Sequence, residues 1–170
     1  EKYGKLKRTS EALDKLIEET HAQIVHLESI QNALDIATSA DDLVQIKEEL
    51  TESGYIRRKG GSKKEKVTSK PFHYISSDGY HMYVGKNNLQ NDYLTFKTAR
   101  KDHIWMHAKD YHGAHVVITN PNPTEEMIRL GAHIAAWYSK GRMSSSVPVD
   151  WCPVKNLKKV PGTKPGFVSM

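Results

Sequence analysis

Leucine recurs at every seventh residue, with one interruption, through the first 34 residues of the chain. The positions concerned are Leu6, Leu13, Thr20, Leu27 and Leu34. A seven-residue apolar repeat is typical of a coiled coil, so the sequence predicts one long helix with an apolar seam along one side. Ile17 and Ile24 widen this seam, and an unpaired apolar stripe is poorly soluble. We therefore expect a partner helix, from outside this chain or from a second copy of it, in preference to a lone solvated helix.

A second, shorter helix is predicted directly after the first. Ser39, with Asp42 three residues later, is a pattern typical of helix starts, because both side chains can accept backbone N–H groups there. Apolar residues at helical spacing follow, and Gly54 marks the end of the pattern. Residues 1–56 are therefore expected to form a helical arm.

Charge divides the chain into two unlike parts. Residues 1–53 carry 6 Lys and Arg against 12 Asp and Glu, a net −6, whereas residues 54–170 carry 19 against 8, a net +11. Residues 57–70 hold seven basic side chains and almost nothing apolar, which predicts a flexible basic linker that orders on RNA or acts only as a spacer. The basic part is suited to phosphate backbones, although a basic domain without a polyanion partner is the alternative.

Strand and helix patterns alternate through residues 71–170. Two β-rich runs flank Ser77-Asp78-Gly79, a hairpin signal, because Gly tolerates the positive φ of tight turns. Helices are predicted at 87–99 and 124–140. Further extended segments are predicted near 103–107, 114–118, 147–154 and 166–170. The order of these elements predicts an α+β domain with a mixed or antiparallel sheet and two or more helices.

The strand at 103–107 carries an unusual set of side chains. Successive residues of a strand point to opposite faces, so His103, Trp105 and His107 share one face while Ile104, Met106 and Ala108 share the other. The β-branched run after His115 predicts a pairing strand beside it. A flat ring among imidazoles and a nearby Lys suits exposed bases and phosphates. Burial of Trp105 in the core is the competing interpretation.

The residues from Asp102 to Ile118, with 85–92 before them and 147–150 after them, resemble the C-terminal domain of the NFACT family. This family is also called the fibronectin-binding-protein-like or ribosome quality-control tailing-factor family. Two positions depart from its pattern, with His112 in place of a Pro and Ala114 in place of a Ser. The resemblance implies that residues 71–170 form the family's RNA-binding domain and continue beyond Met170. It also implies that the helical arm is the returning half of a long coiled coil.

The resemblance implies a function as well. Family members bind large ribosomal subunits obstructed by peptidyl-tRNA, recruit tRNA and support template-independent C-terminal tailing of stalled chains. The tRNA-selecting residues of the family lie in an N-terminal domain outside this chain. Bacterial relatives are also named as fibronectin- or fibrinogen-binding surface proteins without a secretion signal. An adhesin fragment at the cell surface is therefore the alternative to a cytoplasmic factor.

We expect RNA to contact basic, amide and ring side chains of the C-terminal domain. The candidates are Lys86, Asn87, Asn88, Lys97, Arg100, Lys101, Trp105, His107, Lys109, His115, Lys155, Lys158 and Lys159. Residues 86–88 open a helix whose N–H groups can receive a phosphate, although turn and capping roles are the alternative. Residues 97–101 and 155–159 form two basic clusters, which a solvated helix end and a turn explain equally well.

Other classes of protein receive little support. No apolar run approaches the roughly 20 residues needed to span a bilayer, and no signal-peptide pattern is present. A lone Cys152 cannot form an internal disulfide, which favours the cytoplasm. Pairs such as His103 with His107, or His112 with His115, lack the companions of a zinc site, so no metal or cofactor is expected. A metal-dependent RNA-processing enzyme, resting on Asp102, Asp110 and Asp150, is the weakest alternative, because no catalytic constellation is evident.

Overall fold

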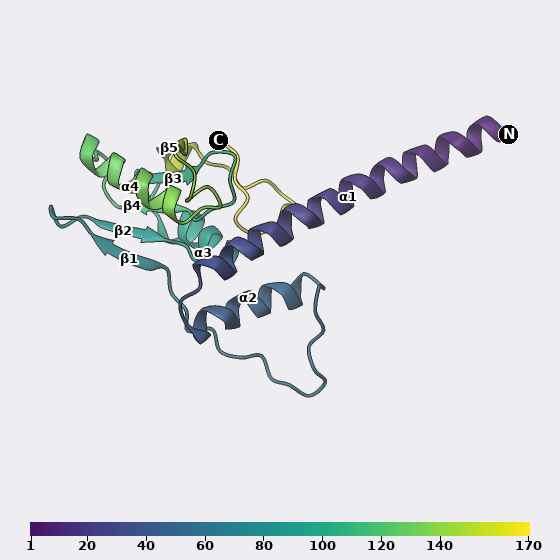
Figure 1. Ribbon diagram of the computed structural model, residues 1–170, viewed down its shortest axis with the longest axis horizontal. Coiled ribbons are helices and arrows are strands. Elements are labelled where there is room, and N and C mark those ends of the chain that lie inside the picture. The colour runs from purple at the N-terminus through teal and green to yellow at the C-terminus, as the bar shows by residue number, and fades with distance from the viewer.

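The computed structural model describes residues 1–170 as a helical arm joined to an α+β body (Figure 1). The arm comprises α1 (Lys2–Ile36) and α2 (Ala40–Glu52). The helical elements of the body are α3 (Asn88–Tyr93), the π-helical segment η1 (Leu94–Thr98), α4 (Glu125–Trp137) and the short 3-10 turn η2 (Val154–Asn156). The strands are β1 (Phe72–Ile75), β2 (His81–Val84), β3 (Ile104–Ala108), β4 (Val116–Ile118) and β5 (Val149–Pro153). The predicted class, with a long and a short helix before an α+β domain, is confirmed.

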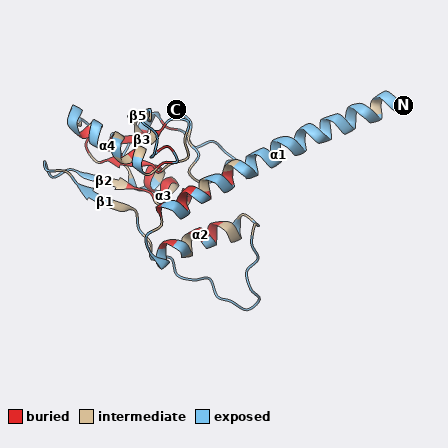
Figure 2. Ribbon diagram, viewed as in Figure 1, coloured by how far each residue is buried: buried red, intermediate tan, exposed pale blue.

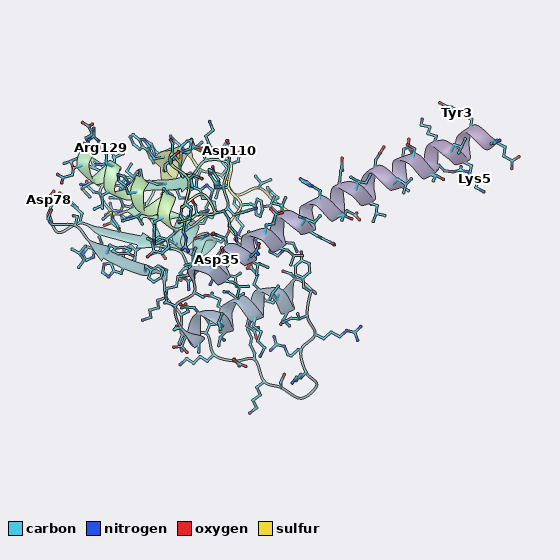
Figure 3. All side chains as sticks on the ribbon, viewed as in Figure 1. Tyr3, Lys5, Asp35, Asp78, Asp110 and Arg129 are labelled. Carbon is cyan, nitrogen blue, oxygen red and sulfur yellow. The ribbon has the colours of Figure 1, made fainter.

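The outer half of α1 stands free in solvent, as its labelled side chains Tyr3 and Lys5 illustrate (Figure 3). The predicted seam lies on this free part: Leu13 is 54% exposed and Ile17 is 65% exposed. Buried residues appear on α1 only where its inner end meets α2 and the body (Figure 2). The single long helix is confirmed, and the partner helix that would cover the seam stays a prediction. No helix of the chain combines the length and the apolar character that crossing a bilayer requires.

The inner end of α1 packs against α2 through Ile30, Ala33 and Ile46, which form a small buried cluster. The predicted start of α2 is confirmed, but its hydrogen bonding differs from the expectation. The Ser39 side chain accepts no capping hydrogen bond, whereas the Asp42 carboxylate accepts the backbone N–H of Thr38 at 2.9 Å. Asp42 therefore makes one of the two capping hydrogen bonds, the one in which a side chain inside the helix accepts an N–H from a residue before the helix.

Residues 57–70 contain no helix or strand and run beside the acidic helix α2 (Figure 1). Arg58 lies 2.9 Å from Glu48, Lys64 lies 3.2 Å from Glu52, and Lys47 of α2 lies 3.1 Å from Glu65. Ion pairs that are largely solvent-exposed contribute only about 0–1 kcal/mol each. The exposed pairs of Lys64 and Glu65 hold the basic linker weakly, whereas Arg58 and Ser69 contact the buried Glu48 and Asp42 of α2. The ordering of the linker on RNA stays a prediction.

The five strands form one antiparallel sheet in the order β1-β2-β4-β3-β5. Gly79 has a φ of +82° in the predicted hairpin between β1 and β2, a backbone conformation that glycine adopts without strain. Two predicted extended segments are shorter than expected. Ala114 precedes β4 and donates its N–H to the carbonyl of Tyr138, while residues 166–170 contribute only a bridge between Lys158 and Ser169.

The two faces of the sheet are covered unequally. On one face, α4 packs Met127 and Ala135 against Met106 and its neighbours across β2, β3 and β4. On the other face, Leu94 and residues 154–157 cover β3 and β4 but leave the β1–β2 hairpin open. The predicted start of α4 is confirmed, because the Thr124 hydroxyl accepts the N–H of Met127. The sheet therefore presents one closed face and one partly open face.

Candidate functional site

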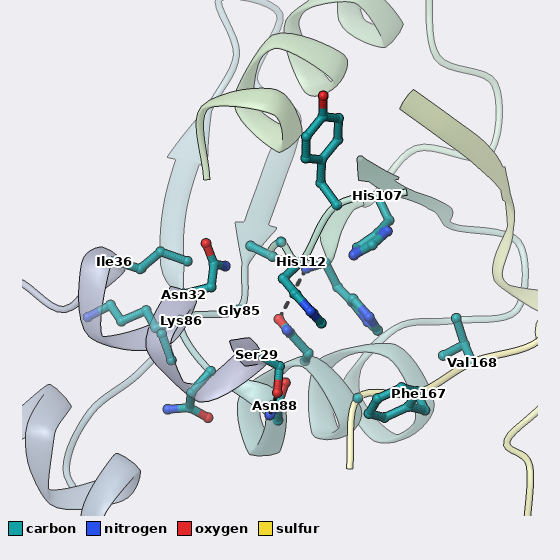
Figure 4. Close-up of a pocket in the computed structure, with 18 of the residues that line it drawn as sticks. Ser29, Asn32, Ile36, Gly85, Lys86, Asn88, His107, His112, Phe167 and Val168 are labelled. Atoms are coloured by element: carbon teal, nitrogen blue, oxygen red, sulfur yellow. Dashed lines mark hydrogen bonds between the residues drawn. The ribbon is translucent and has the colours of Figure 1, made fainter. Parts of the chain in front are cut away.

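Six of the predicted site residues line one pocket where the arm meets the body (Figure 4). They are Lys86, Asn87, Asn88, Trp105, His107 and His115. The pocket holds about 290 Å³ and lies between the inner end of α1, the start of α3 and residues 166–170. Its remaining walls include Asn32 of α1 and Phe167 near the end of the chain (Figure 4). These six residues are therefore neighbours in the folded chain.

The side chains of residues 86–88 contact the arm, which favours the turn and capping alternative over a phosphate contact. Lys86 Nζ lies 3.0 Å from Asp42 Oδ1 and is largely buried. Asn88 donates from Nδ2 to Glu49 Oε1 at 2.7 Å, and its side chain is buried. The N–H of Lys86 donates to the Gln90 side chain at 3.0 Å. These residues dock the arm onto the body, and Asn87 also caps α3 by accepting the N–H of Gln90.

The interpretation of Trp105 as an exposed stacking ring is wrong. The indole is 3% exposed and packs in a cluster with Leu94, Val117, Val154 and Leu157. Strand alternation placed it correctly on the face opposite Ile104 and Met106, but both faces of β3 are covered here. Its Nε1–H has no hydrogen-bond partner. Trp105 is therefore a core residue, with only a small part of its surface at the wall of the pocket.

The two imidazoles beside Trp105 are not cationic contacts either. His115 is 3% exposed, and its ring Nδ1 shares a hydrogen bond with the Thr95 hydroxyl at 2.8 Å. The backbone N–H of His115 donates to the Asn91 side chain. Burial, with a smaller contribution from His107, lowers the pKa of His115 to about 3. Burial likewise lowers the pKa of His107, against the opposing influence of Asp150. Because His115 is buried, the expected surface role of this residue is corrected.

Lys109 follows the last residue of β3. The two predicted basic clusters come together at the other end of this strand, where β3 begins. The N–H of Lys155 donates to the carbonyl of Lys101 at 2.9 Å, and the N–H of Val154 donates to the carbonyl of His103. The two clusters, joined by these backbone contacts, contain six exposed basic residues, which we call the basic edge. It consists of Lys97, Arg100, Lys101, Lys155, Lys158 and Lys159.

Within the basic edge, two residues have acidic partners. Lys159 lies 2.7 Å from Asp92, and Arg100 lies 3.6 Å from Asp102. The other four basic side chains make no ion pair, so their charge is free for a ligand. Lys109 is exposed but lies beyond the far end of β3, and its N–H donates to Pro148. It does not join the edge.

The acidic and histidine groups considered for metal chemistry are spread apart. Asp102 and Asp110 lie at opposite ends of β3, so these carboxylates do not converge. The structure contains no cluster of three or more His, Cys, Asp or Glu side chains arranged to hold an ion.

A set of rings that the sequence analysis did not single out lies on the open face of the hairpin. His73 and Tyr83 are paired across β1 and β2, with ring centroids 4.6 Å apart and planes 7° apart. His81 lies beside His73, with Nδ1 at 2.5 Å from His73 Nε2. We call these three residues the ring face. Alternate positions of both strands, His73 with Ile75 and His81 with Tyr83, carried the signal, because strand period places them on one side.

Two protein-family models together match the whole chain. The model for NFACT N-terminal and middle domains matches residues 1–69, and the model for the NFACT protein RNA binding domain matches residues 70–170. The boundary falls at the end of the basic linker.

Curated relatives match over nearly the full length of the chain. Proteins named Rqc2 homolog RqcH are 48% identical in Streptococcus suis and 46% identical in Streptococcus pneumoniae, each over 170 residues, and 42% identical in Bacillus subtilis over 171 residues. Each match covers 99% of this chain and 30% of the relative. The chain therefore spans about a third of the length of the curated relatives it matches.

A solved structure has the same fold. The C-terminal part of the fibronectin/fibrinogen-binding protein from Streptococcus suis superimposes with a TM-score of 0.89 at 48% identity. The match covers 99% of this chain and 68% of that one.

Proposed function

This chain belongs to the NFACT family, and we propose that its body binds RNA along the basic edge, mainly through phosphates. The observation that carries the proposal is the convergence of two basic segments, distant in sequence, on one border of the sheet. Lys97, Lys101, Lys155 and Lys158 are exposed and make no ion pair. Four such charges attract a phosphate backbone, release its counterions, and select no particular sequence. The role is binding and not catalysis.

The relatives support a more specific proposal. Because they are named as homologues of Rqc2, we propose that the full-length protein acts in ribosome quality control in the cytoplasm. The family resemblance extends this to binding of obstructed large ribosomal subunits and tRNA, and to template-independent tailing of stalled chains. In that setting the arm would pair its exposed seam with another helix of the protein. The body would hold ribosomal RNA or tRNA on the basic edge.

Salt dependence tests the basic edge. We expect a variant with Lys97, Lys101, Lys155 and Lys158 replaced by alanine to bind tRNA more weakly, because four phosphate contacts are lost. The slope of log affinity against log salt should fall in magnitude by about three, since each neutralised phosphate contributes about 0.7–0.9. Fluorescence anisotropy of labelled tRNA over a salt series measures this slope.

The matched control carries the same loss of charge on the arm, with Lys2, Lys5, Lys7 and Lys15 replaced by alanine. Its slope should equal that of the unmodified protein. An edge variant that keeps the full slope, with circular dichroism showing an intact fold, would place the phosphate contacts elsewhere.

Binding of a matrix protein is the second candidate, favoured by the name of the similar Streptococcus suis structure. The basic edge offers charge for an acidic partner of any kind. A dedicated matrix-binding role requires saturable capture of fibronectin at physiological salt by the monomeric chain. Capture that disappears with salt and with the edge variant would be charge attraction alone.

A further inference from the structure

We propose that the ring face is a stacking platform for unpaired bases, so that this domain binds single-stranded RNA segments in addition to phosphate backbones. The inference rests on the proposed RNA binding and specifies the form of the RNA. The ring face comprises His73, His81 and Tyr83, whose rings are nearly parallel, with interplanar angles between 7° and 19°. Since His73 stacks on both His81 and Tyr83, with centroids 4.6–4.8 Å apart, a base extends this stack on the side of a ring that no neighbouring ring covers.

The platform is open to solvent, unlike the Trp105 surface. His73 and His81 are both exposed, and Ile75, which pairs with His81 in the register, is 61% exposed. The covering elements η1 and 154–157 reach only the neighbouring part of this sheet face. The hairpin that carries the rings extends away from the body, with Asp78 at its tip (Figure 3).

The rings are also fixed in place before any ligand arrives. The contact between His73 Nε2 and His81 Nδ1, at 2.5 Å, joins the two imidazoles through their nitrogens, with ring centroids 4.8 Å apart. Tyr83 is half-buried and packs against the core cluster around Trp105. A platform whose side chains are already ordered loses little conformational entropy on binding.

A groove connects the platform to the basic edge. It holds about 580 Å³ and is lined by Tyr83 from the ring face, Tyr93 from α3 and Lys97 from the basic edge. Tyr93 is 66% exposed and adds another ring, and Lys70 adds another positive charge. Because Tyr83 belongs to both platform and groove, and Lys97 to both groove and edge, one strand can follow the whole path. Alternating rings and lysines match the bases and phosphates of a single strand.

Two exposed rings, His73 of the platform and Tyr93 of the groove, are replaced to test base stacking without disturbing the core. A ring-loss variant carries His73→Ala and Tyr93→Ala, and a ring-keeping variant carries His73→Phe and Tyr93→Phe. We expect the ring-loss variant to bind a short oligoadenylate about tenfold or more weakly than the unmodified protein, because stacking of each base is lost. Its affinity for an RNA duplex and its salt slope should not change. The ring-keeping variant should bind both RNAs like the unmodified protein.

The outcomes separate this inference from the proposed function. If the ring-loss variant binds oligoadenylate normally while the edge variant does not, the platform is wrong and the basic edge stands. If both ring variants lose affinity equally, the contact depends on imidazole nitrogen or phenol oxygen atoms, and stacking is wrong. If the unmodified protein binds neither oligoadenylate nor duplex, the proposed RNA binding itself fails.

Discussion

Replacing Trp105 with alanine is expected to lower the free energy of unfolding by about 3–5 kcal/mol, the usual cost of truncating a buried indole. The ring fills the space between β3, η1 and residues 154–157, where it contacts Leu94, Val117 and Val154. Its loss leaves a cavity that strands and helix cannot close without moving. Chemical denaturation followed by circular dichroism measures the change.

Trp137 provides a control of the same residue type. It lies on α4, is 56% exposed, and has only the Arg142 guanidinium over its ring. Trp137→Ala should cost no more than about 1 kcal/mol. If Trp105→Ala left stability unchanged and weakened only RNA binding, the indole would be a contact residue and its assignment to the core would be wrong.

The second large effect concerns Asp42, which links the arm to the body. Its carboxylate is 2% exposed and accepts hydrogen bonds from Ser69 at 2.6 Å, from Thr38, and from Lys86 at 3.0 Å. Asp42→Ala leaves the largely buried Lys86 ammonium without a partner, which typically costs about 3–5 kcal/mol. We expect α2 to detach from the body, and hydrogen exchange of α2 amides, together with denaturation, should report it.

Glu65→Ala is the matched control, because it also removes a carboxylate that is paired with a lysine. Glu65 and Lys47 are 54% and 62% exposed, so this variant should change stability by less than about 1 kcal/mol. Equal effects of the two variants would show that the buried Asp42 contacts do not hold the arm.

Low pH should reduce the difference in the free energy of unfolding between the unmodified protein and the Asp42→Ala variant. Burial of Asp42 opposes its ionisation, but hydrogen bonds from Ser69 and Thr38 and the Lys86 charge outweigh it and hold the Asp42 pKa well below its usual range. A depressed carboxyl pKa stabilises the folded state above the unfolded pKa, and this contribution is lost as the pH falls toward the folded pKa. The stability difference should therefore be complete at neutral pH and shrink below about pH 4.

Local signals in the sequence predicted the secondary structure well. The seven-residue repeat predicted α1, Gly79 predicted the hairpin turn, and Thr124 predicted the start of α4. Each of these depends on residues within a few positions of one another, so a single stretch of sequence contains the cause. The basic clusters at 97–101 and 155–159 were found for the same reason, although their meeting at one edge depends on the pairing of β3 with β5.

The environment of individual site residues depended on distant partners and could not be read from the sequence. Lys86 looked like a phosphate contact, but its partner Asp42 lies 44 residues away on another element. Trp105 looked suited to stacking, but the indole is covered by Leu94, which precedes it in the sequence, and by residues 154–157, which follow it. The ring face is a different case: strand period places its members on one side of β1 and β2, but which residues face each other depends on the register of the hairpin.

Chemical footprinting of lysines tests the central claim most directly, because it reports each side chain in the intact chain. We predict that bound tRNA protects Lys97, Lys101, Lys155 and Lys158 from an amine-reactive reagent, while Lys5 and Lys15 on the free part of α1 react as they do without RNA. Protection confined to the arm, or equal reactivity of all lysines with tRNA bound, would contradict the assignment of RNA binding to the basic edge.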